Sequence, residues 1–415
     1  MKKFSVLLCA VAMLCACSVK DAGYPGGEIT PLDGTDTYPE GDSYEPGIVP
    51  GGNEGEGQEN SAEAGKVTAG EWRDLDHWLF WSSLMTNGQD QEGTDYSETS
   101  SYWGFYTNNR VAVRVVNAAG EPQCDVPVTL NYHEPGIDVA PTPLYQGRTD
   151  NKGEVNLWIG LTQKQDVTDA SNLGILVNNE PEQPVTVTHW GEEVQWNECT
   201  TSVTQTRNID IAFIVDATGS MSDEIDFLKA DLTDIITKVQ SRHTDANIRT
   251  AALFYRDEGD EYLTKHNNFT SNLSQTVNFI KNQHAEGGGD YPEAVHSALA
   301  AGLQDLSWNE EHSVRLAFML LDAPPHHQSD VLASLQQSIP QYAKRGIRII
   351  PVAASGIDKQ TEFFLRFTAM ATDGTYVFIT NHSGIGGEHI EATVGDYEVE
   401  LLNGLIVRLI DQYLQ

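Results

Sequence analysis

Oxygen-bearing side chains gather at three places in the C-terminal half of the sequence. The run Asp216-x-Thr218-x-Ser220 alternates an acid with two hydroxyls directly after an apolar stretch. Asp322 follows a second apolar stretch, and the glycine-rich run 287–293 carries further carboxylates. Hard cations such as Mg²⁺ prefer oxygen ligands, and hydroxyl ligands need carboxylates nearby to supply negative charge. The pattern therefore predicts a divalent-cation site assembled from three separated segments.

Other interpretations exist for each of these residues. The run 216–220 on its own could be a helix N-cap, because Ser and Thr often cap helices. The pair His326 and His327 could suggest zinc, but it lacks a spaced partner set, so we interpret it as structural. The acidic run 257–261 could hold calcium, although we expect a solvated loop. The glycines 287–289 could suggest phosphate, but no lysine follows and the flanking acids would repel it.

The segments around these residues alternate between apolar strands and amphipathic helices. Such alternation indicates an α/β domain with an open, mainly parallel sheet, which binds ligands at the carboxyl ends of its strands. Strands are expected at 209–215, 251–255, 314–321, 347–354 and 375–379, and helices at 221–239, 273–283, 291–306, 331–344, 359–370 and 401–413.

Together, the three motifs resemble the von Willebrand factor type A (VWA) domain over residues 206–415. Asp216-x-Thr218-x-Ser220 matches the signature of its metal-ion-dependent adhesion site, and the other two segments resemble its second and third loops. The resemblance implies a Rossmann-like fold and a bound Mg²⁺, or Mn²⁺ or Ca²⁺. It implies that Thr218 and Ser220 ligate the metal directly, while Asp216 and Asp322 act mainly through waters. Many members place a threonine in the second loop, where Asp290 is the best substitute here.

The function that this resemblance implies is metal-mediated recognition of a partner protein. One coordination position of the cation would accept an Asp or Glu carboxylate of the partner. Two alternatives remain: a metal-dependent hydrolase, and a structural subunit of an envelope assembly with a non-functional metal site. We expect no enzymatic activity, because no Ser-His-Asp or Cys-His spacing stands out.

The N-terminus predicts a bacterial lipoprotein. Lys2 and Lys3 precede an apolar stretch that ends in Leu14-Cys-Ala-Cys17, which resembles a lipobox. Residues 1–17 are therefore expected to be a signal peptide, with Cys17 lipidated and the protein anchored to the outer membrane, at the surface of a Gram-negative cell. An ordinary secretory signal is the alternative. The chain has 60 acidic and 25 basic residues, a net charge of −35 that argues against nucleic-acid binding.

Two further regions are expected between the signal and residue 206. Residues 18–66 are rich in Gly, Pro and acids and predict a flexible tether. Residues 67–205 contain short strands and turns that predict a small all-β sandwich, similar to carboxypeptidase-regulatory-like and immunoglobulin-like modules. The aromatic segment 71–84 is expected to pack this domain or its contact with the next. Cys124 and Cys199 could form a disulfide or remain two unpaired thiols.

Overall fold

The structure, a computed structural model, describes residues 63–86, 95–203 and 208–414. These residues belong to one compact unit, 60–415. The predicted signal peptide with Cys17, and nearly all of the predicted tether, lie outside the described residues. Among the described residues, no helix is long and apolar enough to cross a bilayer.

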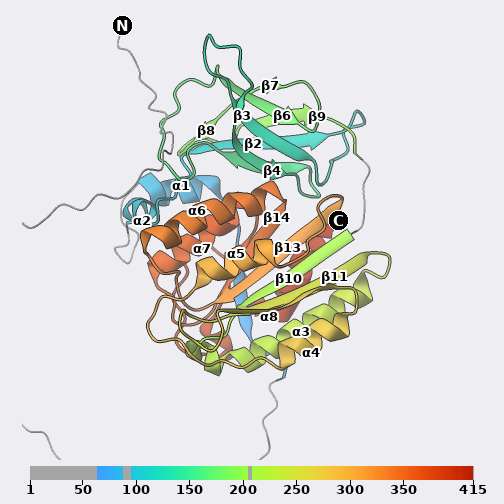
Figure 1. The fold of residues 1–415 in the computed structure, drawn as a ribbon, viewed down its shortest axis with the longest axis vertical. Helices are drawn as coiled ribbons and strands as arrows, with labels where there is room; N and C mark the ends of the chain where they lie inside the picture. The colour runs from blue at the N-terminus through green and yellow to red at the C-terminus, as the bar shows by residue number, and fades with distance from the viewer. Residues whose placement is uncertain (1–62, 87–94, 204–207, 415) are drawn as a thin grey trace, which may run out of the picture. The chain divides into compact units, whose positions relative to one another are not determined.

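An eight-stranded sheet forms the centre of the α/β part, in the order β12-β11-β10-β13-β14-β15-β1-β16 (Figure 1). The strands β11, β10, β13, β14 and β15 are parallel, whereas β12, β1 and β16 join antiparallel. The sheet is therefore mainly parallel, as predicted. The strands are β1 (Thr68–Trp72), β10 (Asn208–Asp216), β11 (Asn247–Tyr255), β12 (Thr264–Thr270), β13 (Ser313–Leu321), β14 (Ile347–Ala353), β15 (Tyr376–Ile379) and β16 (Glu400–Leu401).

Helices cover both faces of this sheet. Successive strand residues point to opposite faces, so in β10 Phe213 joins one hydrophobic cluster while Ala212 and Ile214 join the other. Helices α3, α4 and α8 complete the first cluster, and α5, α6 and α7 complete the second (Figure 1). Their bounds are α3 (Ile225–Arg242), α4 (Leu273–Lys281), α5 (Val295–Gln304), α6 (Ser329–Lys344), α7 (Lys359–Ala371) and α8 (Leu402–Leu414).

Two four-stranded sheets form the region between residues 109 and 200. One has the order β5-β2-β8 with β9 beside β2, and the other has the order β4-β3-β6-β7. Their buried residues share one hydrophobic cluster with the α5–α7 face of the large sheet, and β4 contacts α6. The strands are β2 (Asn109–Val116), β3 (Pro127–Tyr132), β4 (Thr142–Arg148), β5 (Glu154–Trp158), β6 (Leu173–Val177), β7 (Gln183–Pro184), β8 (Thr188–His189) and β9 (Trp196–Thr200).

The predicted start of a separate β domain at residue 67 is wrong. Strand β1 pairs with β15 and β16 in the large sheet, where it covers an edge that would otherwise expose unpaired backbone groups. Helices α1 (Trp78–Thr86) and α2 (Tyr96–Trp103) follow, and α2 contacts α7. The segment before residue 109 thus belongs structurally to the α/β part.

Buried aromatic and ionic contacts hold this N-terminal segment in place. Trp81 is fully buried and stacks on Phe363 of α7, with ring centroids 5.5 Å apart. Arg366 donates two hydrogen bonds to Asp74, from Nε at 2.9 Å and from Nη2 at 2.6 Å. The aromatic segment therefore packs between parts of the molecule, in agreement with its predicted role.

Cys124 and Cys199 are both free thiols. Cys124 packs against the cluster on the α3–α4–α8 face, whereas Cys199 of β9 belongs to the opposite cluster. Its Sγ donates to Gln183 Oε1 at 3.5 Å. Burial raises the pKa of each thiol to about 11. The two cysteines therefore form no disulfide in this structure, because the partly buried Cys124 and the buried Cys199 belong to separate hydrophobic clusters.

Candidate metal centre

Two adjacent parallel strands bring the first and third motifs together. Asp216 is the last residue of β10, and Asp322 directly follows β13. The two strands are paired in register, with Val215 opposite Leu320. Since parallel strands end at the same edge of a sheet, the two acids lie at one edge.

The first motif folds back on its own acid. The backbone amide and the hydroxyl of Thr218 both donate to Asp216 Oδ1, at 2.9 Å and 2.7 Å. The hydroxyls of Thr218 and Ser220 are 3.2 Å apart. Asp216 and Thr218 are fully buried, while Ser220 is exposed. The motif therefore places a buried acid below two adjacent hydroxyls, of which the outer one faces solvent.

The glycine-rich second loop closes over the first motif. Gly219 donates its amide hydrogen to the carbonyl of Gly287 at 3.0 Å. Gly288 has φ +70°, and a Cβ there would lie 2.9 Å from Glu293 Oε1 and 3.3 Å from Thr218 Cβ. Only glycine fits this conformation and this close approach without strain. The contact also shows that Glu293 is the second-loop acid that lies near Thr218.

Glu293 was not among the predicted ligands. It is buried, 2% exposed, and its Oε2 has no hydrogen-bond partner among residues 63–86, 95–203 and 208–414. Its backbone amide donates to Pro324 in the third loop at 2.9 Å, which fixes it two residues before α5. The sequence did contain a signal for it, because Glu293 is the other carboxylate of the run that supplied Asp290.

Asp290 lines the same pocket but belongs to a different group of side chains. Asp290 is exposed, and its carboxylate lies near Asp257 and His326, with one ligand atom from each of the three within 4.8 Å of the others. His326 Nε2 is 2.8 Å from Asp257 Oδ1. The acidic run 257–261 is thus not a uniformly solvated loop, since the side chain of Asp257 is only 9% exposed.

We refer to Asp216, Thr218, Ser220, Glu293 and Asp322 as the strand-end cluster. Burial raises the pKa of all three acids, and repulsion from other nearby carboxylates raises them further. The pKa is raised to about 6 for Asp216, about 7 for Asp322 and about 9 for Glu293. The hydroxyl of Ser220 beside Asp322 works in the opposite direction. Without a cation, the cluster must therefore retain protons.

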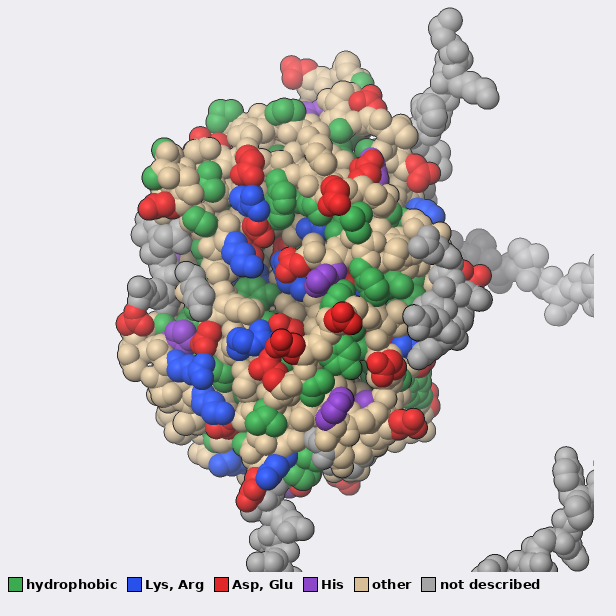
Figure 2. Space-filling view, turned by 180° about the vertical axis from the view of Figure 1, so that it is seen from behind, with side chains coloured by type: hydrophobic (Ala, Val, Ile, Leu, Met, Phe, Trp, Pro, Cys, Tyr) green, Lys and Arg blue, Asp and Glu red, His purple; other side chains and the backbone are tan. Residues whose placement is uncertain are grey.

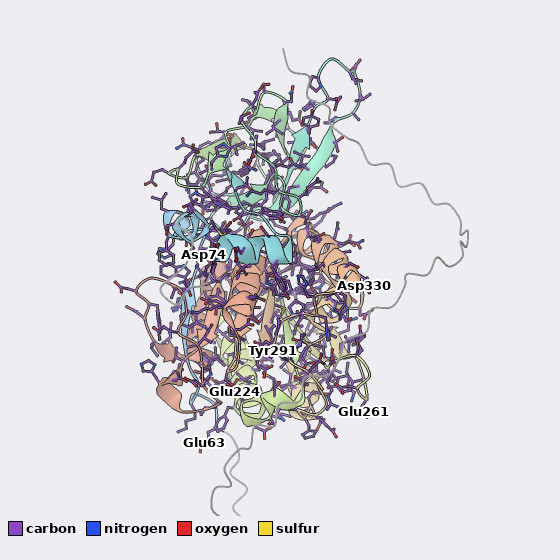
Figure 3. All side chains as sticks on the ribbon, turned by 90° about the vertical axis from the view of Figure 1, so that its left-hand side faces the viewer. Glu63, Asp74, Glu224, Glu261, Tyr291 and Asp330 are labelled. Atoms are coloured by element: carbon purple, nitrogen blue, oxygen red, sulfur yellow. The ribbon has the colours of Figure 1, made fainter. Side chains whose placement is uncertain are left out.

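The cluster lies in a pocket of about 400 Å³ that is lined by Ser220, Glu293 and Asp322 together with glycine backbone. Tyr291, 43% exposed, stands at the rim, where its hydroxyl donates to the Gly356 carbonyl at 3.1 Å. Its hydroxyl also accepts from the amide of Asp358 at 3.0 Å. Figure 3 shows Tyr291 at the same end of the α/β part as Glu224 and Glu261. The pocket is therefore accessible and has a fixed rim.

The donor set fits a hard divalent cation. Within the described part of the chain, Oδ2 of Asp216 and Oδ1 of Asp322 are buried and form no well-directed hydrogen bond, although the Tyr255 hydroxyl lies beside Asp216. Buried polar atoms in native proteins normally have partners. The cluster offers carboxylate and hydroxyl oxygens, which are the ligands that Mg²⁺ and Ca²⁺ take. These free oxygens are what a cation would satisfy.

Residues 210–381 match the von Willebrand factor A domain family, and the chain therefore contains a VWA domain. A putative ariadne-like RING finger protein of Acanthamoeba polyphaga mimivirus is 33% identical over 131 residues, which cover 32% of this chain and 12% of that protein. The alpha-protein kinase vwkA of Dictyostelium discoideum is 27% identical over 142 residues, covering 34% and 22%. The matches thus span less than a quarter of either relative.

Among solved structures, the conserved hypothetical protein BatB from Bacteroides thetaiotaomicron is similar to about half of the chain. It has 11% sequence identity and a TM-score of 0.35, and the match covers 49% of this chain and 98% of that one.

Proposed function

We propose that the strand-end cluster is a metal-ion-dependent adhesion site through which this protein binds an acidic side chain of a partner protein. Mg²⁺ is the expected cation, with Mn²⁺ or Ca²⁺ as substitutes. Thr218 and Ser220 would hold it directly, and Asp216 and Asp322 would hold it mainly through waters. The bound cation would supply a Lewis-acidic position for the incoming carboxylate.

The observation that carries this proposal is the meeting of oxygens from three loops. Ser220, Glu293 and Asp322 line an accessible pocket, the hydroxyl of Ser220 is adjacent to that of Thr218, and Thr218 in turn donates to the buried Asp216. Glu293 adds a third buried acid in the place of the threonine that many VWA domains carry. Because a carboxylate is more negative than a hydroxyl, we expect Glu293 to strengthen the binding of the cation. The same negative charge should weaken the bond between the cation and the partner's carboxylate.

Because the chain is strongly negative, an acidic partner needs the bound cation as its point of attachment. The net charge is −35, and Figure 2 shows acidic side chains spread over the visible face, with basic ones between them. Long-range attraction of an acidic protein is therefore unfavourable, and at physiological salt the surface charges are screened beyond about 8 Å. Recognition must then come from short-range contact at the pocket.

We further propose that the protein performs this binding at the outer surface of a Gram-negative cell, as a lipoprotein. The support is the sequence pattern at Cys17 and the Gly- and Pro-rich residues 18–66, which would give the folded part reach. We also propose that residues 109–200 are a carboxypeptidase-regulatory-like or immunoglobulin-like sandwich. The two four-stranded sheets with a shared hydrophobic cluster support this assignment.

Titration calorimetry with Mg²⁺, followed by recovery of surface proteins in Mg²⁺ or in chelator, tests the proposal. Asp216→Ala should abolish both cation uptake and partner binding. Ser220→Ala should weaken both without affecting folding, because Ser220 is exposed. Asp138→Ala is the matched control, an exposed acid on the β3–β4 loop. Partner binding that persists in chelator, or in Asp216→Ala, would contradict the proposal.

A further inference from the structure

We propose that Asp257, Asp290 and His326 form a second cation site beside the strand-end cluster, one that takes a divalent transition metal ion such as Zn²⁺. The three residues come from three loops: the β11–β12 loop, the glycine-rich loop and the β13–α6 loop. The two sets share no residue, so variants of one set can be tested for their effect on the other.

The geometry of the three side chains requires only a small adjustment. Their ligand atoms lie within 4.8 Å of one another, and His326 Nε2 is already 2.8 Å from Asp257 Oδ1. Ligands of tetrahedral zinc at about 2.0–2.1 Å from the metal lie about 3.3 Å apart. Asp257 and His326 are held by packing, with side chains 9% and 14% exposed, whereas Asp290 is exposed and can move. Closing the site therefore needs a shift of the exposed Asp290, together with a separation of the His326–Asp257 pair by about 0.5 Å.

Glu293 of the strand-end cluster lies close enough to the second group for the charge of Asp257 to act on it. Glu293 is 2% exposed, its Oε2 has no hydrogen-bond partner among the described residues, and repulsion by Asp216 and Asp257 adds to the effect of burial in raising its pKa. Arg256, the neighbour of Asp257 in the chain, pairs with neither Asp257 nor Glu293 in the part of the chain that the structure describes. Arg256 extends Nη1 toward Glu261 and Nη2 toward Glu286, each at 3.7 Å. A cation at the second site would offset the excess negative charge.

The donor chemistry separates the two sites. The strand-end cluster offers oxygen atoms, which suit Mg²⁺, whereas an imidazole nitrogen with two carboxylates suits zinc and related ions. Three protein ligands leave a fourth position of zinc to water. In the metal-free state His326 and Asp257 share a hydrogen bond, and the metal would take the place of the shared proton. Bound metal would tie the glycine-rich loop to its neighbours.

The test is Zn²⁺ titration of the full chain by calorimetry in excess Mg²⁺, with the absorption spectrum of the Co²⁺-loaded protein as a second measurement. We expect one Zn²⁺ per chain that Mg²⁺ does not displace. His326→Asn should weaken it by about tenfold or more, on the scale that losing a metal-site contact costs. Asp290→Asn should do the same without a folding defect, because Asp290 is exposed. Both variants should lose the Co²⁺ spectrum.

Two matched variants make the outcome decisive. His327→Asn alters the adjacent histidine, which stacks on Tyr102 with ring centroids 3.6 Å apart, and should bind Zn²⁺ like the wild type. Ser220→Ala should also keep the Zn²⁺ site while weakening Mg²⁺ uptake. If His326→Asn and Asp290→Asn titrate like the wild type, or if Ser220→Ala is the variant that loses Zn²⁺, the second site does not exist.

Discussion

The strand-end cluster is expected to release protons when it takes up Mg²⁺, and the number released should fall as pH rises. Asp216, Asp322 and Glu293 have pKa values of about 6, about 7 and about 9 in the metal-free protein. A bound cation favours the ionised form of each acid, so protons still present must leave. At a given pH, the number released is the number that the three carboxyls still hold.

The three pKa values give the size of the effect. At pH 7 Glu293 is almost fully protonated, Asp322 is half protonated and Asp216 is mostly ionised, which gives about one and a half protons per ion. The number should approach about three at pH 5 and fall to about one half at pH 9. Mg²⁺ affinity should accordingly increase across this range.

The same pKa values fix how the stability of the metal-free protein depends on pH. A carboxyl whose pKa is raised on folding binds its proton more tightly in the folded state. Its contribution to the free energy of unfolding is fully present below its pKa in the unfolded chain, about 4. This contribution is lost as pH rises through its pKa in the folded protein. The metal-free protein should therefore lose stability between about pH 5 and pH 9, and saturating Mg²⁺ should remove most of this loss.

Calorimetric titration with Mg²⁺ in buffers of different ionisation enthalpy measures the released protons directly. Glu293→Gln should lower the number at pH 7 by about one, because this carboxyl holds nearly a full proton there. Glu261→Gln is the matched control, an acid whose side chain is 75% exposed. An observed heat that is independent of the buffer at pH 7 would refute this reasoning, as would an unchanged proton count in Glu293→Gln.

Three further substitutions test two buried ion pairs of the fold and the glycine-rich loop of the site. Asp125→Ala leaves buried Arg315 without its partner and should cost roughly 3–5 kcal/mol in urea unfolding. Burial raises the pKa of Asp125, but the hydrogen bonds and charges of Arg315 and Arg148 together lower it below its usual value. The stabilisation should therefore vanish as pH falls below about 4, and a loss that acid does not change would contradict this. Asp74→Ala removes the hydrogen-bonded acid from the buried Arg366 and should lower the free energy of unfolding by a similar amount. Equal urea midpoints for the variant and the wild type would contradict this expectation. Gly288→Ala should cost about 1–2 kcal/mol through its positive φ and weaken Mg²⁺ binding measured by calorimetry, and an unchanged Mg²⁺ affinity would contradict this.

The sequence was sufficient to predict the parallel core and the meeting of the first and third motifs. In an α/β fold, apolar runs such as 209–215 and 314–321 form the buried strands of the sheet. Parallel pairing places the carboxyl ends of these strands at the same edge. Asp216 and Asp322 therefore had to share an edge. The first run contains one acid, Asp210, which a buried strand can accommodate because Arg249 of the neighbouring strand pairs with it at 2.7 Å.

The details of the second loop could not be read from the sequence. Asp290 and Glu293 are three residues apart, and which one faces Thr218 depends on the backbone of the glycines, not on any periodicity. Gly287 and Gly288 both adopt positive φ, +85° and +70°, and this turns the loop so that Glu293 faces inward and Asp290 outward. Glycine permits many such paths, so the composition of the loop does not select one.

Strand β1 escaped prediction because its partners are distant in the sequence. Its five residues pair with β15, about 300 positions later, and nothing local in Thr68–Trp72 distinguishes an edge strand of the large sheet from one of a β domain. Gly70 is the clearest sign of the contact, since a Cβ there would lie 2.7 Å from both Phe378 and Tyr397. Glycine in a strand often marks such close approach.

The VWA domain and the unit that folds around it consequently differ in extent. The family match begins at residue 210, yet β1 covers an edge of its sheet and Asp74 neutralises Arg366 within α7. The segment also reaches the site: Tyr102 stacks on His327, next to His326 and on the loop that begins with Asp322. Contacts of this kind position the third loop from outside the domain. The N-terminal segment therefore helps to position the loop that carries Asp322 of the strand-end cluster.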